Sequence, residues 1–180
     1  MTDEQQQLWQ AIRRFEIDDP SASFSFTDRL ARENDWSLEY AIRVVYEYKK
    51  FMFLICVSDH PLTPSDQVDQ AWHLHLIYTH SYWADFCQNT INRQIHHGPT
   101  KGGQTEKDKY HDWYEETKKS YIAKFGNEPP EDIWPSSKVR FGEIVFSRVN
   151  RHRFWIIPKP TKMKKLWNTL TNSLRQKPNS

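Results

Sequence analysis

The sequence has few cysteines and no long apolar run. Only Cys56 and Cys87 occur among 180 residues, in no CxxC or CxxH pattern, which argues against a disulfide framework or a zinc finger. We expect both to be buried thiols in a reducing compartment. No stretch approaches the roughly 20 apolar residues of a membrane-spanning helix, and the N-terminus lacks the features of a secretory signal. A cytoplasmic location is therefore expected.

Aromatic residues, by contrast, are plentiful. The chain contains 8 Trp, 8 Tyr and 10 Phe, although its mean hydropathy is only −0.86. Because each ring buries a large apolar area, the predicted core consists mainly of rings. A chain of this length suits one domain that buries roughly two-thirds of its unfolded surface without needing a disulfide or structural metal.

Charge is distributed unevenly along the chain. Residues 138–180 contain 11 Lys and Arg residues but a single acid, Glu143. The remaining 14 basic and 22 acidic residues lie in residues 1–137, which follows from totals of 25 and 23. We therefore expect a helical domain over residues 1–137 and a basic C-terminal extension over residues 138–180, packed on or projecting from that domain.

The spacing of apolar residues predicts a mainly α, single-domain bundle of about five helices. The expected helices cover roughly residues 8–15, 26–30, 38–56, 66–88 and 106–125. Ser37 should cap the third helix, Thr63 and Pro64 should begin the fourth, and Gly126 should end the fifth. Residues 129–135, with three prolines and Trp134, predict an extended Pro/Trp strap, and residues 141–157 could add a short C-terminal β-hairpin.

Histidine is concentrated in the fourth predicted helix, since five of the eight histidines lie between His73 and His97. At about 100° per residue, a helix over residues 66–88 would place Asp69, His73, His80 and Cys87 on one stripe about 40° wide. His75 would point about 200° away from His73. One metal ion therefore cannot bind both imidazoles of the WHLH sequence in a regular helix.

A metal site in this region would use Asp69 and His73 as an i, i+4 pair. Further ligands would come from His80, His96, His97 or His111, and such a set suits zinc, manganese or iron. The sequence contains no HExxH motif, so the general-base glutamate of the metalloproteases is missing from its usual place. The alternative is that these histidines are structural and bind a carbonyl oxygen or Asp69.

Two other kinds of chemistry are less favoured. Cys87 would lie about 10.5 Å along the helix from His80, which is too far for a thiol activated by that imidazole, although His96 or His97 could approach it. A buried, inert thiol is the favoured interpretation. Residues 96–104 hold three glycines and Lys101, which could cradle a phosphate, but the spacing is not that of a P-loop and a plain connector is favoured.

Four segments of the chain follow the sequence pattern of a known protein family. The resemblance is carried by four segments, in this order: SFTDRLARENDWSLEYAIRVVYEYKKFMFL, PSDQVDQAWHLHLIYTHSYWADFC, HHGPTKGG and YEETKKSYIAKFGNEPPEDIWP. Together they resemble the bacterial glycine-rich domain-containing proteins, over roughly residues 24–141. VDQAWHLH with Tyr82 and Cys87 is also similar to the V-D-x-x-W-H-x-H…Y…C signature of plant and fungal glycine-rich-domain proteins.

The resemblance implies no particular reaction or cofactor, but it emphasises certain residues. These are Asp69, Trp72, His73, His75, Tyr82, Cys87 and the His96-His97 loop. His80 and His111 lie outside the shared signature, which weakens them as ligands. This chain also departs from the longer members, because it has no glycine-rich tract and ends in a basic extension.

Two functional hypotheses follow. The first, which we favour, is a small cytoplasmic binding or accessory module with a His/Asp-lined pocket, in which Trp72, His75, Tyr82 and Cys87 are structural. The second is a metal-dependent hydrolase or oxidoreductase that uses Asp69, His73 and His96 or His97. The second needs a base and an open coordination position, neither of which the sequence places.

The expected partner of such a module is another protein or, through the basic extension, an anionic membrane surface. Residues 148–165 interleave cations with Phe154, Trp155, Ile156 and Ile157, a composition that adsorbs to anionic lipid and, less favoured here, to nucleic acid. A peripheral membrane location is therefore an alternative to a purely cytoplasmic one. The extension could equally fold against the acidic body.

Overall fold

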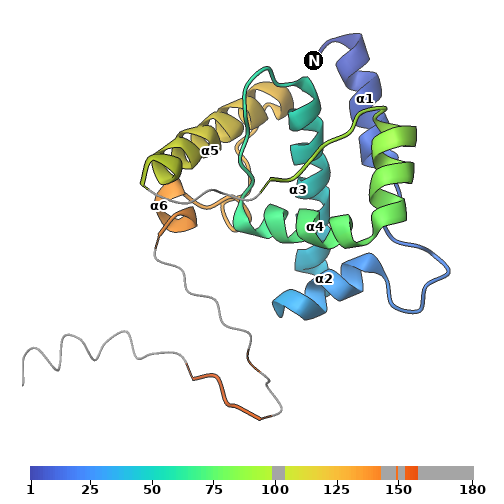
Figure 1. Cartoon of the computed structure of the whole chain (residues 1–180), viewed down its shortest axis with the longest axis vertical. Helices are drawn as coiled ribbons and strands as arrows, with labels where there is room; N and C mark the ends of the chain where they lie inside the picture. The colour runs from blue at the N-terminus through green and yellow to red at the C-terminus, as the bar shows by residue number, and fades with distance from the viewer. Residues whose placement is uncertain (99–103, 143–148, 150–152, 158–180) are drawn as a thin grey trace, which may run out of the picture. The chain divides into compact units, whose positions relative to one another are not determined.

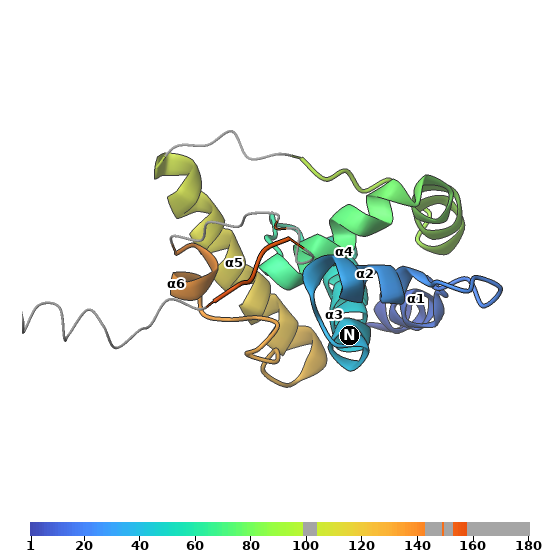
Figure 2. The same cartoon turned by 90° about the horizontal axis from the view of Figure 1, so that it is seen from below.

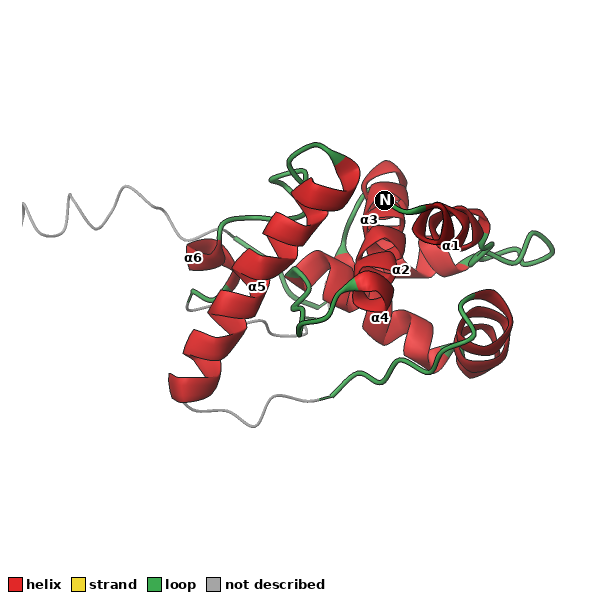
Figure 3. Ribbon diagram, turned by 90° about the horizontal axis from the view of Figure 1, so that it is seen from above, coloured by secondary structure: helices red, strands yellow, loops and turns green. Residues whose placement is uncertain are grey.

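The computed structural model describes residues 1–98, 104–142, 149 and 153–157, without the side chains of residues 104–108. In these residues the chain is all-helical, with seven helices and no strand (Figure 3). The chain divides into two compact units, Met1–Glu143 and Ile144–Ser180. No helix in the described part is both long enough and apolar enough to cross a membrane.

The first two helices begin at complete capping boxes. In α1 (Asp3–Arg14), Thr2 and Gln5 exchange side-chain and backbone hydrogen bonds. In α2 (Phe26–Asn34), Ser25 and Asp28 do the same. These reciprocal bonds satisfy amide groups that a helix start otherwise leaves unpaired, and they fix where each helix begins.

Helix α3 (Leu38–Val57) is the centre of the helical unit. Ser37 caps it as predicted, accepting a hydrogen bond from the Tyr40 amide. It contacts α1, α2, α4 and α5, and Figures 1 and 2 both show it between α5 and α1. The prediction of a core made of rings is confirmed, since the largest fully buried side chains include Trp134, Tyr48, Tyr82, Tyr114, Tyr121, Phe26, Phe51, Phe53 and Phe86.

Helix α4 (Asp66–Ile77) begins at the predicted residue but has a different cap. The cap is Ser65, whose hydroxyl accepts a hydrogen bond from the Val68 amide, and Pro64 lies before the helix. The Thr63 amide instead donates to the Thr117 hydroxyl on α5 at 3.0 Å. The prediction of Thr63 as the cap is therefore wrong: its amide joins the loop before α4 to α5, and its buried hydroxyl has no hydrogen-bond partner in the described part of the chain.

The single helix predicted over residues 66–88 is also wrong. Helix α4 ends when the Tyr78 amide closes a tight turn on the His75 carbonyl at 3.0 Å. A π-helix, η1 (His80–Thr90), follows, and the Ile91 amide still bonds a carbonyl five residues back, that of Phe86. In Figure 1, η1 is the unlabelled green helix beside α1, and its axis turns away from that of α4.

Helix α5 (Gln104–Phe125) ends as predicted at Gly126. This glycine has a φ of +77° and donates its amide to the Ile122 carbonyl at 2.8 Å. The Pro/Trp strap that follows is not extended throughout, because the Trp134 amide folds back onto the Pro130 carbonyl at 2.7 Å. The turn carries Ile133 and Trp134 into the core.

A buried carboxylate joins α3, α5 and the strap. Glu47 accepts hydrogen bonds from Lys50 at 2.9 Å, Tyr121 at 3.2 Å and the indole of Trp134 at 3.0 Å. Each donor comes from a different part of the chain, so the carboxylate fixes the strap against two helices. Such a charge is tolerated in a core only because its oxygens are satisfied.

The short helix α6 (Ser137–Arg140) follows the strap and packs against α5. The predicted hairpin over residues 141–157 and the basic extension over residues 138–180 fall largely outside the described residues. The residues of the predicted hairpin that are described, 141–142, 149 and 153–157, contain no strand. The domain boundary at residue 137 stays a prediction.

Candidate functional site

Two histidines and one aspartate meet beside α4. Asp69 and His73 lie one turn apart on that helix, and His97 comes from the segment after η1. His97 Nε2 lies 2.8 Å from Asp69 Oδ1, and His73 Nε2 lies 4.0 Å from the same oxygen. One ligand atom from each residue can be chosen so that all lie within 4.8 Å of one another. We call these three residues the Asp69 cluster.

The Asp69 cluster is buried on one side and open on the other. The side chains of Asp69 and His97 are each 18% exposed, whereas that of His73 is 51% exposed. The His97 ring packs edge-on against Trp72, with ring centroids 4.4 Å apart, and lies 4.5 Å from the His73 ring. Two of the three donors are thus held in place, and the third faces solvent.

A relay of hydrogen bonds fixes the segment that carries His97. The indole of buried Trp72 donates to the Tyr82 hydroxyl at 2.9 Å. That hydroxyl in turn donates to the carbonyl of Ile95 at 2.6 Å. Burial raises the pKa of Tyr82 well above its ordinary value, which keeps the donor protonated. Since Ile95 lies two residues before His97, the relay anchors the imidazole over Asp69.

A cation lies on the other side of Asp69. Arg140 on α6 places Nη2 4.0 Å from Asp69 Oδ2 and Nη1 3.9 Å from Asp66 Oδ1. Its Nε donates to the Pro64 carbonyl at 3.3 Å. Arg140 therefore faces one oxygen of Asp69, while His97 bonds the other. Sequence analysis missed Arg140, because no local pattern relates it to a helix that begins 74 residues earlier.

His75 lies in the core, away from the Asp69 cluster. It is fully buried, with Nδ1 2.9 Å from the Tyr48 hydroxyl and Nε2 3.1 Å from the Ser81 hydroxyl. Burial, reinforced by the positive charge of Lys49, lowers the pKa of this imidazole to about 3. A neutral ring donates through one nitrogen and accepts through the other. The expected divergence of His73 and His75 is thus observed.

The other histidines considered as ligands lie elsewhere. His80 is exposed on η1, with Nδ1 3.1 Å from Asp85. His96 packs against Trp83, with ring centroids 5.3 Å apart, and His111 is exposed on α5. The predicted stripe of His73, His80 and Cys87 is wrong, because the chain turns at Tyr78 and continues as a π-helix.

Cys87 is buried, and burial raises the pKa of its thiol. The structure thus places it inside the core rather than on a surface shared with His73. Burial also raises the pKa of Cys56, to about 11. Both groups are thiols rather than thiolates at neutral pH, the form that neither attacks an electrophile nor binds a metal well.

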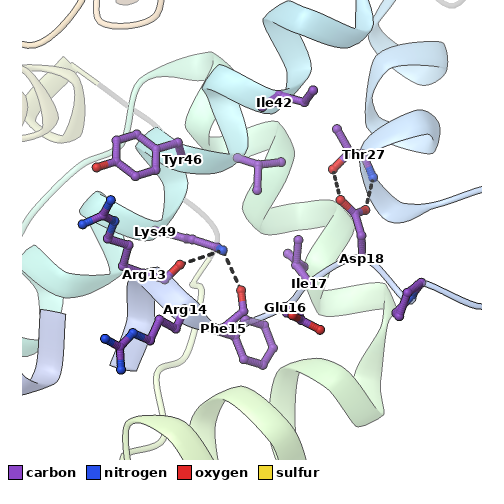
Figure 4. Close-up of a pocket in the computed structure, with 12 residues that line it drawn as sticks. Arg13, Arg14, Phe15, Glu16, Ile17, Asp18, Thr27, Ile42, Tyr46 and Lys49 are labelled. Atoms are coloured by element: carbon purple, nitrogen blue, oxygen red, sulfur yellow. Dashed lines mark hydrogen bonds between the residues drawn. The ribbon is translucent and has the colours of Figure 1, made fainter. Parts of the chain in front are cut away.

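A cavity of about 510 Å³ lies where α1 ends against α3 (Figure 4). Lys49 occupies its wall, and its ammonium donates to the carbonyls of Arg13 at 3.2 Å and Phe15 at 2.6 Å. A lysine in this position satisfies carbonyls that the end of α1 leaves unpaired. Lys49 therefore works as a helix cap, and burial lowers the pKa of its amine.

Comparison with known protein families identifies one that matches most of the helical unit. A family model described as UCP032817-like matches residues 10–122, a range that includes all of the Asp69 cluster. No curated protein and no solved structure matches the chain. These comparisons show no link to the glycine-rich-domain proteins, so that resemblance rests on the motifs alone.

Proposed function

The chain belongs to the UCP032817-like family, and we propose that its helical unit is a metal-binding accessory module in which the Asp69 cluster holds one divalent transition-metal ion. The main observation behind this proposal is that one ligand atom from each of Asp69, His73 and His97 lies within 4.8 Å of the others. Two ligands that are each about 2.1 Å from an ion lie at most about 4.2 Å apart. The exposed His73 ring can make that adjustment by rotating.

The type of donor narrows the choice of ion. Two imidazoles and one carboxylate suit zinc, iron(II) or manganese, whereas calcium and magnesium prefer oxygen ligands throughout. A set of two histidines and one carboxylate leaves coordination positions open. Those positions would face solvent on the His73 side, where water or a donor from a partner protein can complete the coordination.

The same open positions also suit a metal-dependent hydrolase or oxidoreductase. The described contacts of the Asp69 cluster, however, add a guanidinium from Arg140 and an indole from Trp72. Neither group acts as a general base at neutral pH. This favours a module that presents its metal to a protein partner over an enzyme. The VDQAWHLH motif contributes two of the three donors, Asp69 and His73. Metal binding would therefore explain two of the residues on which the resemblance to glycine-rich-domain proteins rests.

Elemental analysis of protein purified without a nickel column tests the proposal. We expect about one zinc, iron or manganese ion per chain, and loss of that ion in His73→Ala and His97→Ala. His80→Ala is the matched control, because it removes an exposed histidine that already lies beside a carboxylate, Asp85, outside the cluster. Circular dichroism verifies that each variant is folded.

Titration of the metal-free protein with zinc chloride gives an independent measure. Loss of either histidine should weaken binding by at least about 100-fold, since even groups behind the ligands contribute 10- to 100-fold. Metal that stays bound in both variants, or wild-type protein that neither contains nor binds zinc, iron or manganese, would refute the proposal. Metal-dependent turnover of a generic ester or peroxide would favour the enzyme instead.

A further inference from the structure

Four consecutive large apolar side chains lie exposed in the C-terminal unit. The exposed fractions are 60% for Phe154, 92% for Trp155, 63% for Ile156 and 78% for Ile157. In the described part of the other unit, the exposed large apolar residues are never consecutive in sequence, although Leu38 and Ile42 lie one turn apart on α3. Single exposed apolar residues are ordinary, but a contiguous apolar patch marks an interaction surface.

We propose that residues 153–157 dock the protein on the surface of an anionic lipid bilayer. The positive charge around this segment favours an anionic partner. Arg153 adjoins the apolar residues, and residues 144–180 hold 9 Lys and Arg residues and no Asp or Glu. Each lysine or arginine held near an anionic membrane raises the binding constant by about fivefold.

The apolar residues favour lipid over nucleic acid. Trp155 carries a flat ring with a polar N–H, the kind of side chain that concentrates at the boundary between headgroups and hydrocarbon. Ile156 and Ile157 offer aliphatic surface, which neither stacks on bases nor binds phosphate but gains by leaving water for acyl chains. Four such residues are far fewer than the roughly 20 that span a bilayer, so the expected mode is peripheral.

Co-sedimentation of the full-length protein with vesicles tests the docking segment. We expect the protein to pellet with phosphatidylcholine vesicles that contain phosphatidylserine, to stay soluble with phosphatidylcholine alone, and to be released by salt. Trp155→Ala combined with Ile157→Ala keeps every charge and should weaken binding by about tenfold or more. Arg153→Gln keeps the apolar residues and should weaken binding about fivefold.

Ile42→Ala is the matched control, since it removes an aliphatic side chain that is 56% exposed on α3, and it should bind vesicles as the wild type does. Circular dichroism of each variant should be unchanged, because Arg153, Trp155 and Ile157 lie outside the helical core. Three results would each overturn the proposal: no binding to phosphatidylserine vesicles, equal binding by the double variant, or tighter binding to a duplex DNA fragment than to vesicles. The metal content is independent of all three.

Discussion

The hydroxyl of Tyr82 lies 2.6 Å from the carbonyl oxygen of Ile95 and donates a hydrogen bond to it. This bond ties η1 to the segment that brings His97 over Asp69. Because Trp72 on α4 donates to the same hydroxyl, one oxygen on η1 connects the two parts of the chain that build the Asp69 cluster, α4 and the His97 segment. The precision of the proposed metal site therefore depends on a residue that touches none of its ligands.

Tyr82→Phe keeps the buried ring and removes only this hydroxyl. The Trp72 indole and the Ile95 carbonyl would lose their partner in the core, which should cost about 1–3 kcal/mol of the free energy of unfolding in urea. Zinc affinity should fall by about 10- to 100-fold, because the His97 segment loses its anchor. Tyr40→Phe is the control, since it removes a hydroxyl bonded to the Asp132 carbonyl. Equal zinc affinity in the two variants would contradict a positioning role.

His75 should make folding sensitive to acid. Its pKa is lowered to about 3 in the folded protein but returns to about 6.5 on unfolding. The unfolded chain therefore binds the extra proton first, and the free energy of unfolding should fall by up to about 1.4 kcal/mol per pH unit as the pH drops from about 6.5 to 3. Above about pH 6.5 the His75 ring is neutral in both the folded and the unfolded chain, so it no longer lowers the free energy of unfolding.

Urea denaturation between pH 7 and pH 4 measures this slope. His75→Gln should flatten it, whatever the stability of the variant at pH 7. His80→Gln, which replaces an exposed histidine, should leave it as in the wild type. If His75→Gln had the wild-type slope, the acid sensitivity would come from other groups.

Glu47 and Glu33 should differ sharply in their contribution to stability. Glu47→Ala leaves the Lys50 ammonium and the Trp134 indole without their buried acceptor, a change that typically costs about 3–5 kcal/mol. Glu33→Ala removes an i, i+4 pair with Arg29 at the surface, which is worth about 0.3–0.5 kcal/mol. Urea denaturation of both variants gives the comparison, and similar losses would mean that the Glu47 network contributes little.

Both cysteines should resist thiol reagents in the folded protein. A pKa of about 11 leaves the Cys56 thiolate roughly 100-fold scarcer than in an ordinary cysteine. Cys87 is both buried and raised in pKa. Titration with Ellman's reagent at pH 8 should therefore show slow reaction in native buffer and two fast thiols in guanidinium chloride. A fast thiol in the native state would show that one of them is accessible.

The sequence predicted well what depends on local chemistry. Ser37 and Gly126 mark helix ends because a cap hydroxyl and a left-handed residue act on neighbouring amides and carbonyls. The opposed directions of His73 and His75 follow from the rotation of a regular helix, and α4 is regular over both residues. Asp69 and His73 were paired for the same reason.

The errors concern contacts between distant parts of the chain. Thr63 looked like a cap, but its amide binds Thr117, and Arg140 reaches Asp69 from α6. The turn at Tyr78 and the π-helix after it leave no trace in apolar spacing, so the sequence predicts one continuous helix and a stripe through His80 and Cys87 that the structure does not form. His96 and His97 are equivalent in the sequence, and tertiary contacts distinguish them: His97 packs against Trp72 and His96 against Trp83.

Helix η1 makes the length of the chain before His97 matter. A π-turn takes up one residue more than an α-turn. If the π-turns are kept, deleting a single residue of η1 ahead of Phe86 would shift every later residue by one position, and other side chains would then stand at the buried positions of Phe86 and Cys87. The number of residues between Trp72 and Ile95 is thus constrained by the contacts at its two ends. Insertions or deletions in that interval should be far less tolerated than substitutions on its exposed face.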